Sequence, residues 1–273
     1  MKGPCRIALS GKGGTGKTTI SSLLIQALIG MGESPVLAVD ADPNANLNEA
    51  LGLPLEETLG SMREDAFTKS IPPGMSRTGY IEYRFQQVLV ESDGVDLLAM
   101  GRPEGTGCYC FANRLLSEAM DLLTSHYRFV VMDMEAGMEH FSRGTIGIPD
   151  LLLVVTDPGA RGVRTAGRIH DLAITLGIPS SGIYFVINRS GSAAGVAGGS
   201  SSGTGTGPEG GIGAQAESEP VIDPARILAS IPDDPEVERA DLEARPIISL
   251  PDGSPAKIAV RDLAGKVRAL CTR

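Results

Sequence analysis

The stretch GKGGTGKTT, residues 11–19, lies between an apolar run of strand length, CRIALS (5–10), and a helical pattern over residues 17–31. It satisfies the spacing G-x-x-x-x-G-K-[ST] in the strand–loop–helix context that this motif requires. Its glycines allow the backbone to wrap a phosphate with several N–H groups, at the positive end of a helix dipole. We therefore predict a phosphate-binding loop rather than a glycine-rich turn without a ligand.

The chemistry of this motif places Lys17 at the β- and γ-phosphates of a nucleotide and the Thr18 hydroxyl on Mg²⁺. The other positions supply backbone N–H groups or begin the following helix. The residues predicted to contact the nucleotide here are Gly11, Lys12, Gly13, Gly14, Thr15, Gly16, Lys17, Thr18 and Thr19.

Further apolar runs of strand length recur along the chain, and they are continuous rather than alternating, which is typical of strands buried on both faces of a parallel sheet. They are PVLAVD (35–40), VDLLAM (95–100), FVVMDM (129–134), LLLVVT (151–156), IYFVIN (183–188) and RILASI (226–231). Helical patterns lie between them, at about 79–91, 111–125, 162–177 and 255–270. This alternation of strands and helices predicts one α/β domain over residues 1–273, with a doubly wound, mostly parallel sheet flanked by helices.

Residues 190–219 interrupt that alternation, because they hold ten glycines, no Lys or Arg and almost no large apolar side chain. Such a segment buries too little surface to offset the entropy of ordering it. We expect a disordered insertion within the domain. A flexible lid or a tether for a partner is the functional alternative.

The composition excludes several classes of function. Lys and Arg number 24 against 33 Asp and Glu, which gives a net charge of −9, and no basic tract interleaved with aromatic residues is present. Nucleic-acid binding is therefore not expected. No secretory signal and no apolar run of the roughly 20 residues needed to span a bilayer precede or interrupt the domain, so we expect a cytoplasmic chain.

Two acidic segments follow predicted strands beside the phosphate loop. DADPNANL occupies residues 40–47 and DMEAG residues 133–137. Carboxylates at the carboxyl edge of a sheet can hold Mg²⁺ through water and orient an attacking water. A turn at Asp-Pro-Asn that only caps the next helix is the alternative.

Two of the four cysteines, Cys108 and Cys110, are separated by one tyrosine. In an extended segment both sulfurs would lie on the same face and could contact one ion, but two thiolates fill only half of a four-coordinate shell. An identical chain could supply the other half. Buried thiols and a redox couple remain open at this point. Cys5 and Cys271 receive no role: we expect Cys5 to be buried and Cys271 to be an exposed thiol, without a disulfide framework.

The loop form KGGTGKT resembles the deviant Walker A loop of the nitrogenase-iron-protein/MinD class of P-loop ATPases. In that class the additional lysine, here Lys12, crosses a dimer interface to the nucleotide of the partner subunit, which implies an ATP-bound homodimer. The resemblance implies further roles: catalysis by Lys12, Lys17 and the water-activating Asp42, Mg²⁺ contacts from Asp40 and Asp133, a γ-phosphate sensor at Gly137, and adenine contacts from Asn188 and Asp234.

Residues 78–116, which include GRPEGTGCYC (101–110), resemble the CooC-type ATPases that mature nickel carbon monoxide dehydrogenase. The segments DADPNANL and MEAGMEHFSRGT (134–145) share this resemblance, which covers about 1–190 and 225–270. It implies hydrolysis of ATP to ADP and phosphate, a homodimer, Ni²⁺ held by Cys108 and Cys110 of both chains, and a nickel-enzyme client. The related acetyl-CoA synthase maturation ATPases share these motifs, and Zn²⁺ could occupy the same thiolates.

Two other functions remain open: an ATP-dependent iron–sulfur reductase with a cluster between subunits, and a positioning ATPase in the manner of MinD. The second depends on the segment 256–270, whose apolar stripe could lie on a membrane. The stripe comprises Ile258, Val260, Leu263, Val267 and Leu270. We predict that this helix instead covers a face of the sheet, without stable membrane association.

Overall fold

The computed structural model describes residues 3–61, 72–102, 116–120, 123–138, 141, 147–191 and 222–272. Strands from these residues form one sheet in the order β3-β4-β2-β5-β1-β6-β7-β8. The strands are β1 (Cys5–Gly11), β2 (Val36–Asp40), β3 (Leu89–Ser92), β4 (Val95–Ala99), β5 (Phe129–Asp133), β6 (Leu151–Thr156), β7 (Ile183–Ser190) and β8 (Ile227–Pro232). Every neighbouring pair is parallel except β3 with β4.

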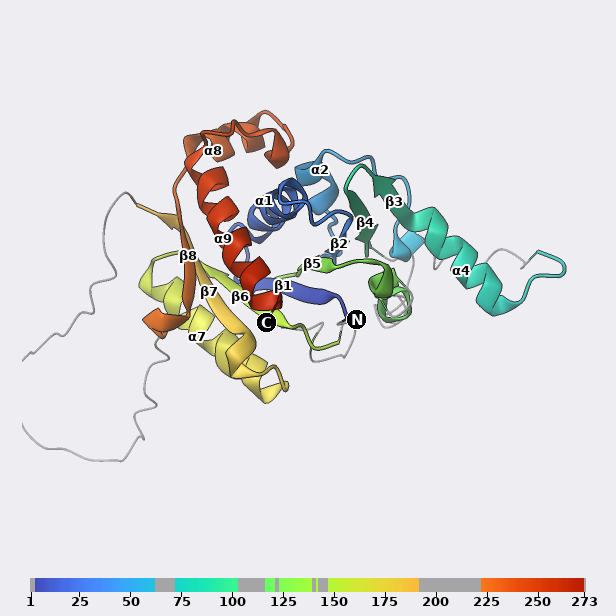
Figure 1. Cartoon of the computed structure of the whole chain (residues 1–273), viewed down its shortest axis with the longest axis horizontal. Coiled ribbons are helices and arrows are strands. Elements are labelled where there is room, and N and C mark those ends of the chain that lie inside the picture. Colours follow the sequence, from blue (N-terminus) through green and yellow to red (C-terminus); the bar gives the residue numbers. More distant parts are fainter. Residues whose placement is uncertain are drawn as a thin grey trace, which may run out of the picture.

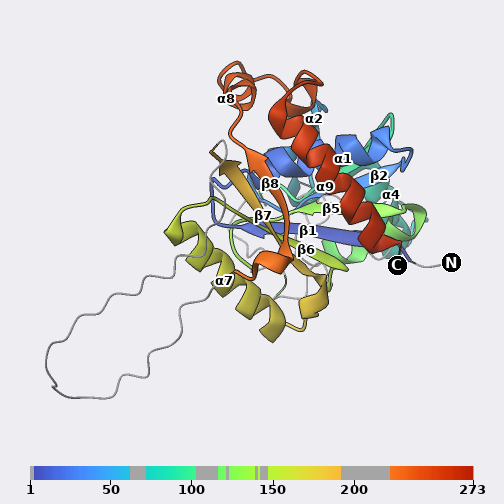
Figure 2. The same cartoon turned by 60° about the vertical axis from the view of Figure 1, so that its left-hand side comes forward.

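Helices lie on both faces of this sheet, and one extends away from it beyond the β3 edge (Figures 1 and 2). They are α1 (Lys17–Gly30), α2 (Leu47–Leu51), α4 (Arg77–Val88), α7 (Ala160–Thr175), α8 (Pro235–Leu242) and α9 (Pro255–Cys271). Short 3₁₀ turns are η1 (Thr124–His126), η2 (Ser180–Gly182), η3 (Pro224–Arg226) and η4 (Ile247–Ser249). The predicted mostly parallel α/β domain is confirmed.

The seven predicted strands all form, and the structure adds β3. The expected helix over 79–91 ends as α4 at Val88, and the chain then enters β3, which forms an antiparallel hairpin with β4. Asp93 and Gly94 connect the two strands, with Gly94 at φ 83°. Asp-Gly between short strands is a strong hairpin signal, so β3 could have been recognised from that dipeptide.

Two predicted segments fall partly or largely outside the described residues. Residues 116–120 of the expected helix 111–125 are helical. Of the expected insertion 190–219, only residues 190–191 are described, so its predicted disorder stays a prediction.

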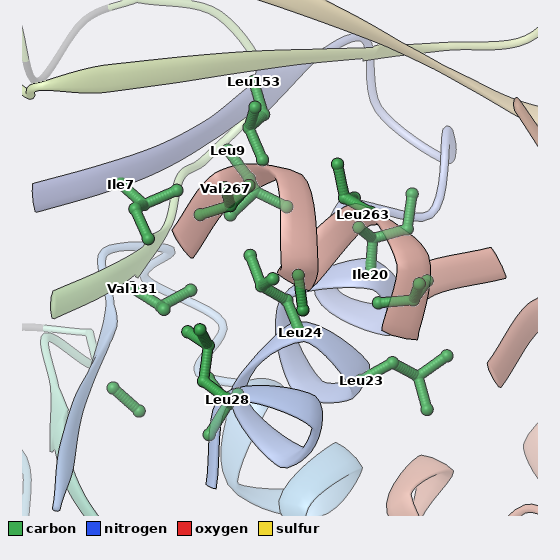
Figure 3. Packing of buried hydrophobic residues seen from close by; sticks show 14 of the residues in the cluster. Ile7, Leu9, Ile20, Leu23, Leu24, Leu28, Val131, Leu153, Leu263 and Val267 are labelled. Carbon is green, nitrogen blue, oxygen red and sulfur yellow. The ribbon is translucent and has the colours of Figure 1, made fainter. Parts of the chain in front are cut away.

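Alternate residues of each central strand pack against opposite layers. Ile7 and Leu9 of β1 belong to the apolar core shared with α1 and α9, whereas Ala8 belongs to the core shared with α7. Figure 3 shows Leu24 and Leu28 of α1 in the first of these cores. This burial on both faces explains the continuous apolar strand sequences.

The C-terminal helix α9 covers the sheet, as predicted. Val260, Leu263 and Val267 are fully buried in the core with α1, while Ile258 is 46% exposed and so lies off the buried stripe. Within the part of the chain that the structure describes, no helix combines the length and the apolar character needed to cross a membrane.

The prediction for Cys271 was wrong, because Cys271 forms a disulfide with Cys5, with the two Cα atoms 5.8 Å apart. Cys5 is buried, as expected. The bond joins the start of β1 to the end of α9, which Figure 1 shows side by side. A sequence separation of 266 residues gives no local signal of pairing. The contact depends on the path of α9 across the sheet, which only the complete fold defines.

We expect reduction of this disulfide to lower the free energy of unfolding by about 2–5 kcal/mol, because the bond restricts the unfolded chain over a long loop. Guanidinium unfolding with and without reductant measures the effect. A Cys271→Ser variant should unfold like the reduced protein and should not respond to reductant. Identical transitions for that variant and the oxidised protein would contradict the expectation.

Candidate nucleotide-binding site

The phosphate loop joins β1 to α1 in a conformation that requires glycine. Gly11 and Gly16 have φ of 155° and 90°. A Cβ on Gly11 would lie 2.3 Å from the carbonyl oxygen of Val155, and a Cβ on Gly16 would lie 2.4 Å from Asn188 Nδ2. The loop therefore packs directly on β6 and β7, which fixes its backbone before a ligand binds.

The two lysines of the loop have different environments. Lys17 is half-buried, and its Nζ donates to the carbonyl oxygens of Gly11 and Lys12 at 3.3 and 3.4 Å. Burial lowers the pKa of Lys17, while the charges of Asp133 and Asp42 oppose that shift. Lys12 is exposed. Lys17 thus lies inside the loop, whereas Lys12 is accessible from outside it.

Asp133, at the end of β5, contacts the first turns of α1. It accepts hydrogen bonds from Thr18 Oγ1 at 2.6 Å and Ser21 Oγ at 3.1 Å. Burial raises the pKa of Asp133 to about 6, although both hydroxyls oppose the shift. The fold thus brings Thr18 and Asp133, each predicted to contact Mg²⁺, within hydrogen-bond distance of each other. Ser21 was missed, although its position one helical turn after Thr18 is a signal that could have found it.

Asp40, at the end of β2, lies opposite Asp133 in the strand register. Its carboxylate accepts from the backbone N–H groups of Asp42 at 3.0 Å and Leu47 at 2.8 Å. Burial, followed by the charge of Asp133, raises the pKa of Asp40 to about 7. Two carboxylates are therefore held close together in the interior, and the charge of Lys17 acts on Asp133.

The loop after β2 presents Asp42. Its Oδ1 accepts from both the backbone N–H and the side-chain Nδ2 of Asn44, each at 2.8 Å. Asn44 Oδ1 in turn accepts from the guanidinium of Arg102. Neither Asn44 nor Arg102 was among the predicted site residues.

Gly137, the predicted γ-phosphate sensor, lies next to the end of β1. Its carbonyl oxygen accepts from Ser10 Oγ at 2.8 Å, and its φ is 105°. The segment after β5 is therefore tied to the strand that leads into the phosphate loop.

A cavity of about 780 Å³ adjoins the phosphate loop, between α1, α8 and the ends of β7 and β8. Asn188 lines it, is nearly buried, and donates through Nδ2 to the carbonyl oxygen of Thr15 at 2.8 Å. Arg189, which was not predicted, also lines the cavity and donates to the carbonyl oxygen of Gly14 at 3.1 Å. Asn188 therefore supports the phosphate loop, while the predicted contact with adenine stays a prediction.

Asp234 also lines this cavity, but its observed contacts are structural. Its carboxylate accepts from the N–H of Glu236 at the start of α8, from Ser254 Oγ at 2.5 Å and from the N–H of Ala256. Burial alone would raise the pKa of Asp234, but these hydrogen bonds outweigh it and lower the pKa. Asp234 thus joins α8 to α9, and its adenine contact stays a prediction.

Cys108 and Cys110 lie outside the described residues, so the structure does not place them. Across the ranges that the structure describes, no group of three or more His, Cys, Asp or Glu side chains is arranged to hold a metal ion.

The sheet order and the phosphate loop define a P-loop nucleotide-binding protein. The chain belongs to the CobQ/CobB/MinD/ParA nucleotide-binding domain family, whose profile matches residues 7–199. The fold agrees with that of MinD from Pyrococcus horikoshii complexed with Mg-ADP, at a TM-score of 0.63 and 22% identity over 97% of this chain and 96% of that one.

Two relatives are more similar in sequence. The uncharacterized ATP-binding protein MJ0685 of Methanocaldococcus jannaschii is 37% identical over 96% of this chain and 97% of its own length. The carbon monoxide dehydrogenase accessory protein CooC of Rhodospirillum rubrum is 39% identical over 63% of this chain and 70% of its own length.

Without nucleotide and Mg²⁺, we expect the buried carboxylates to make the folded chain less stable as the pH rises. Folding favours protonated Asp40 and Asp133, whereas both ionise near pH 4 when unfolded, so their contribution is present below about pH 4 and is lost as the pH passes about 6 and about 7. Urea unfolding between about pH 4.5 and 7.5 measures the slope. An Asp40→Asn variant should show a shallower fall than the wild type, and the surface variant Asp241→Asn should not. Equal slopes for Asp40→Asn and the wild type would contradict this explanation.

Proposed function

We propose that this chain hydrolyses ATP to ADP and phosphate and uses the resulting dimer cycle to deliver nickel to a nickel enzyme. The observation that carries the proposal is the similarity to the CooC accessory protein, together with the motif GRPEGTGCYC over residues 101–110. The client class would be carbon monoxide dehydrogenase or the related acetyl-CoA synthase.

The phosphate-loop geometry supports the ATPase part. Lys17 and the loop N–H groups would neutralise the phosphates, and Asp42 would orient the attacking water. The oxygen donors of Thr18 and Asp133, 2.6 Å apart, suit a hard cation, with Asp40 on the adjacent strand. Mg²⁺ bound there would supply positive charge to the phosphates.

The dimer part depends on Lys12 and the cysteine pair. Lys12 is exposed, so its ammonium group is available to the nucleotide of a second copy. Two copies would also bring together Cys108 and Cys110 from each chain, which completes a four-thiolate shell for the Ni²⁺ cargo. Nucleotide would control delivery by binding the two dimer arrangements with different affinity.

A MinD-like positioning ATPase is the second candidate, because the fold is shared with MinD. Against a membrane anchor in α9, the apolar residues Val260, Leu263 and Val267 are buried within the chain. ATP-dependent co-sedimentation with liposomes would favour this candidate over the nickel ATPase.

We expect the purified protein to bind about one Ni²⁺ per dimer, since four thiolates complete one site. Metal analysis with sizing, with and without ATP, measures the stoichiometry. A Cys108→Ser/Cys110→Ser variant should lose the nickel, while Cys271→Ser, whose cysteine lies at the end of α9, should keep it. Nickel binding by the double variant as in the wild type would exclude this site, and acid-labile sulfide would identify an iron–sulfur cluster instead.

We expect Lys12→Ala to lower kcat for ATP hydrolysis by about 100-fold or more, as the loss of a charge supplied in trans does in other phosphoryl-transfer proteins. ATP affinity should change little, because the Lys12 side chain lies outside its own loop. Lys17→Ala, by contrast, should weaken ATP binding itself. If Lys12→Ala hydrolysed ATP at the wild-type rate and still dimerised, the role in trans would be refuted.

A further inference from the structure

The chain that leaves β4 is held in a fixed position beside the loop 40–47. Ala99 pairs with Asp40 in the strand register, and the N–H of buried Met100 donates to the carbonyl oxygen of Asp40 at 2.8 Å. On its other side, the carbonyl oxygen of Met100 accepts from the N–H of Gly60 at 2.8 Å. Met100 is therefore tied to two neighbouring segments at once.

Gly101 fixes the direction of the chain after Met100. Its φ is 62°, and a Cβ at this position would lie 2.2 Å from Thr58 Oγ1. The backbone therefore packs against Thr58 in a conformation that other residues rarely adopt. As a result, Arg102 starts from a defined point, next to the loop that carries Asp42.

Arg102 determines how the amide of Asn44 is oriented. Its guanidinium donates to Asn44 Oδ1, and only one of the two amide orientations offers an oxygen there. In that orientation Nδ2 points at Asp42 Oδ1, at 2.8 Å, beside the backbone N–H of Asn44 at the same distance. Reversal of the amide would place an oxygen against the carboxylate, which is unfavourable.

The loop between Asp42 and Asn44 is otherwise tight. The N–H of Ala45 donates to the carbonyl oxygen of Asp42 at 3.0 Å, and Ala45 has a φ of 51°, which non-glycine residues seldom adopt. Backbone geometry thus fixes the turn, and the backbone N–H of Asn44 holds one bond to Asp42 Oδ1. The second bond to that oxygen comes from the Asn44 amide, whose orientation matches the donor that Arg102 presents.

We propose that Arg102 is a positioning residue that acts through Asn44 to hold the Asp42 carboxylate in the orientation needed for ATP hydrolysis. This inference rests on the proposed ATPase function, in which Asp42 orients the attacking water. Arg102 reaches Asp42 only through Asn44, so it should affect the chemical step more than ATP binding.

The test is steady-state ATP hydrolysis by the full chain, with kcat and KM measured separately. Arg102→Ala should lower kcat by about 10- to 100-fold, because a misplaced catalytic group costs that much, and should leave KM for ATP within about twofold. Arg102→Lys, which keeps a donor, should recover part of the loss. The matched control is Arg168→Ala, an exposed arginine of α7, and it should behave as the wild type.

A double-mutant cycle separates positioning from a general loss of structure. Asn44→Ala should lower kcat as Arg102→Ala does, and the double variant should lose no more than Asn44→Ala alone, because both act on Asp42 in series. Wild-type kcat in Arg102→Ala, or multiplied losses in the double variant, would overturn the role of Arg102 while leaving the ATPase function intact. A wild-type chain that bound ATP without hydrolysing it would refute the proposed function, and the inference with it.

Discussion

The buried carboxylate of Asp133 is the interaction on which the nucleotide-binding edge depends. It terminates β5 and accepts hydrogen bonds from Thr18 and Ser21, so it attaches the first turns of α1 to the middle of the sheet. The phosphate loop is held between that attachment and the close packing of Gly16 on Asn188. Burial of Asp133 beside Asp40 opposes ionisation of both groups, which is unfavourable in a ligand-free chain. A cation bound at this edge would offset that cost.

Much of the fold could be predicted because its strands are buried on both faces. Their continuous apolar sequences need no knowledge of the partner strands, and the phosphate loop is recognisable from spacing alone. The short elements could not be predicted in the same way. The helix α2 has only five residues, and α8 depends on the cap that Asp234 supplies together with its contacts to α9. Elements of this size gain their stability from tertiary packing rather than from local propensity.

The site divides in the same way, into residues placed by local sequence patterns and residues placed by tertiary packing. Lys17, Thr18 and Asp133 lie where their motifs indicated, because strand ends and loop spacing determine their positions. Arg102 and Arg189 are brought to the site by the sheet order, which places the ends of β4 and β7 near other loops. Asn188 shows a further limit: its amide donates to a backbone carbonyl of the phosphate loop, a contact that the sequence did not indicate. The position of a residue at a strand end thus predicts that it lies near the phosphate loop, but not which group its side chain bonds.

The disulfide between Cys5 and Cys271 has a mechanical consequence. It closes a covalent ring that contains almost the whole folded chain, because it joins the start of β1 to the end of α9. A stretching force applied outside these two residues would pass through the sulfur–sulfur bond and would not reach the sheet. Only after reduction would the same force peel α9 from α1 and draw β1 from between β5 and β6. In single-molecule pulling, the oxidised chain would therefore extend very little, and the nucleotide-binding edge would remain intact under tension.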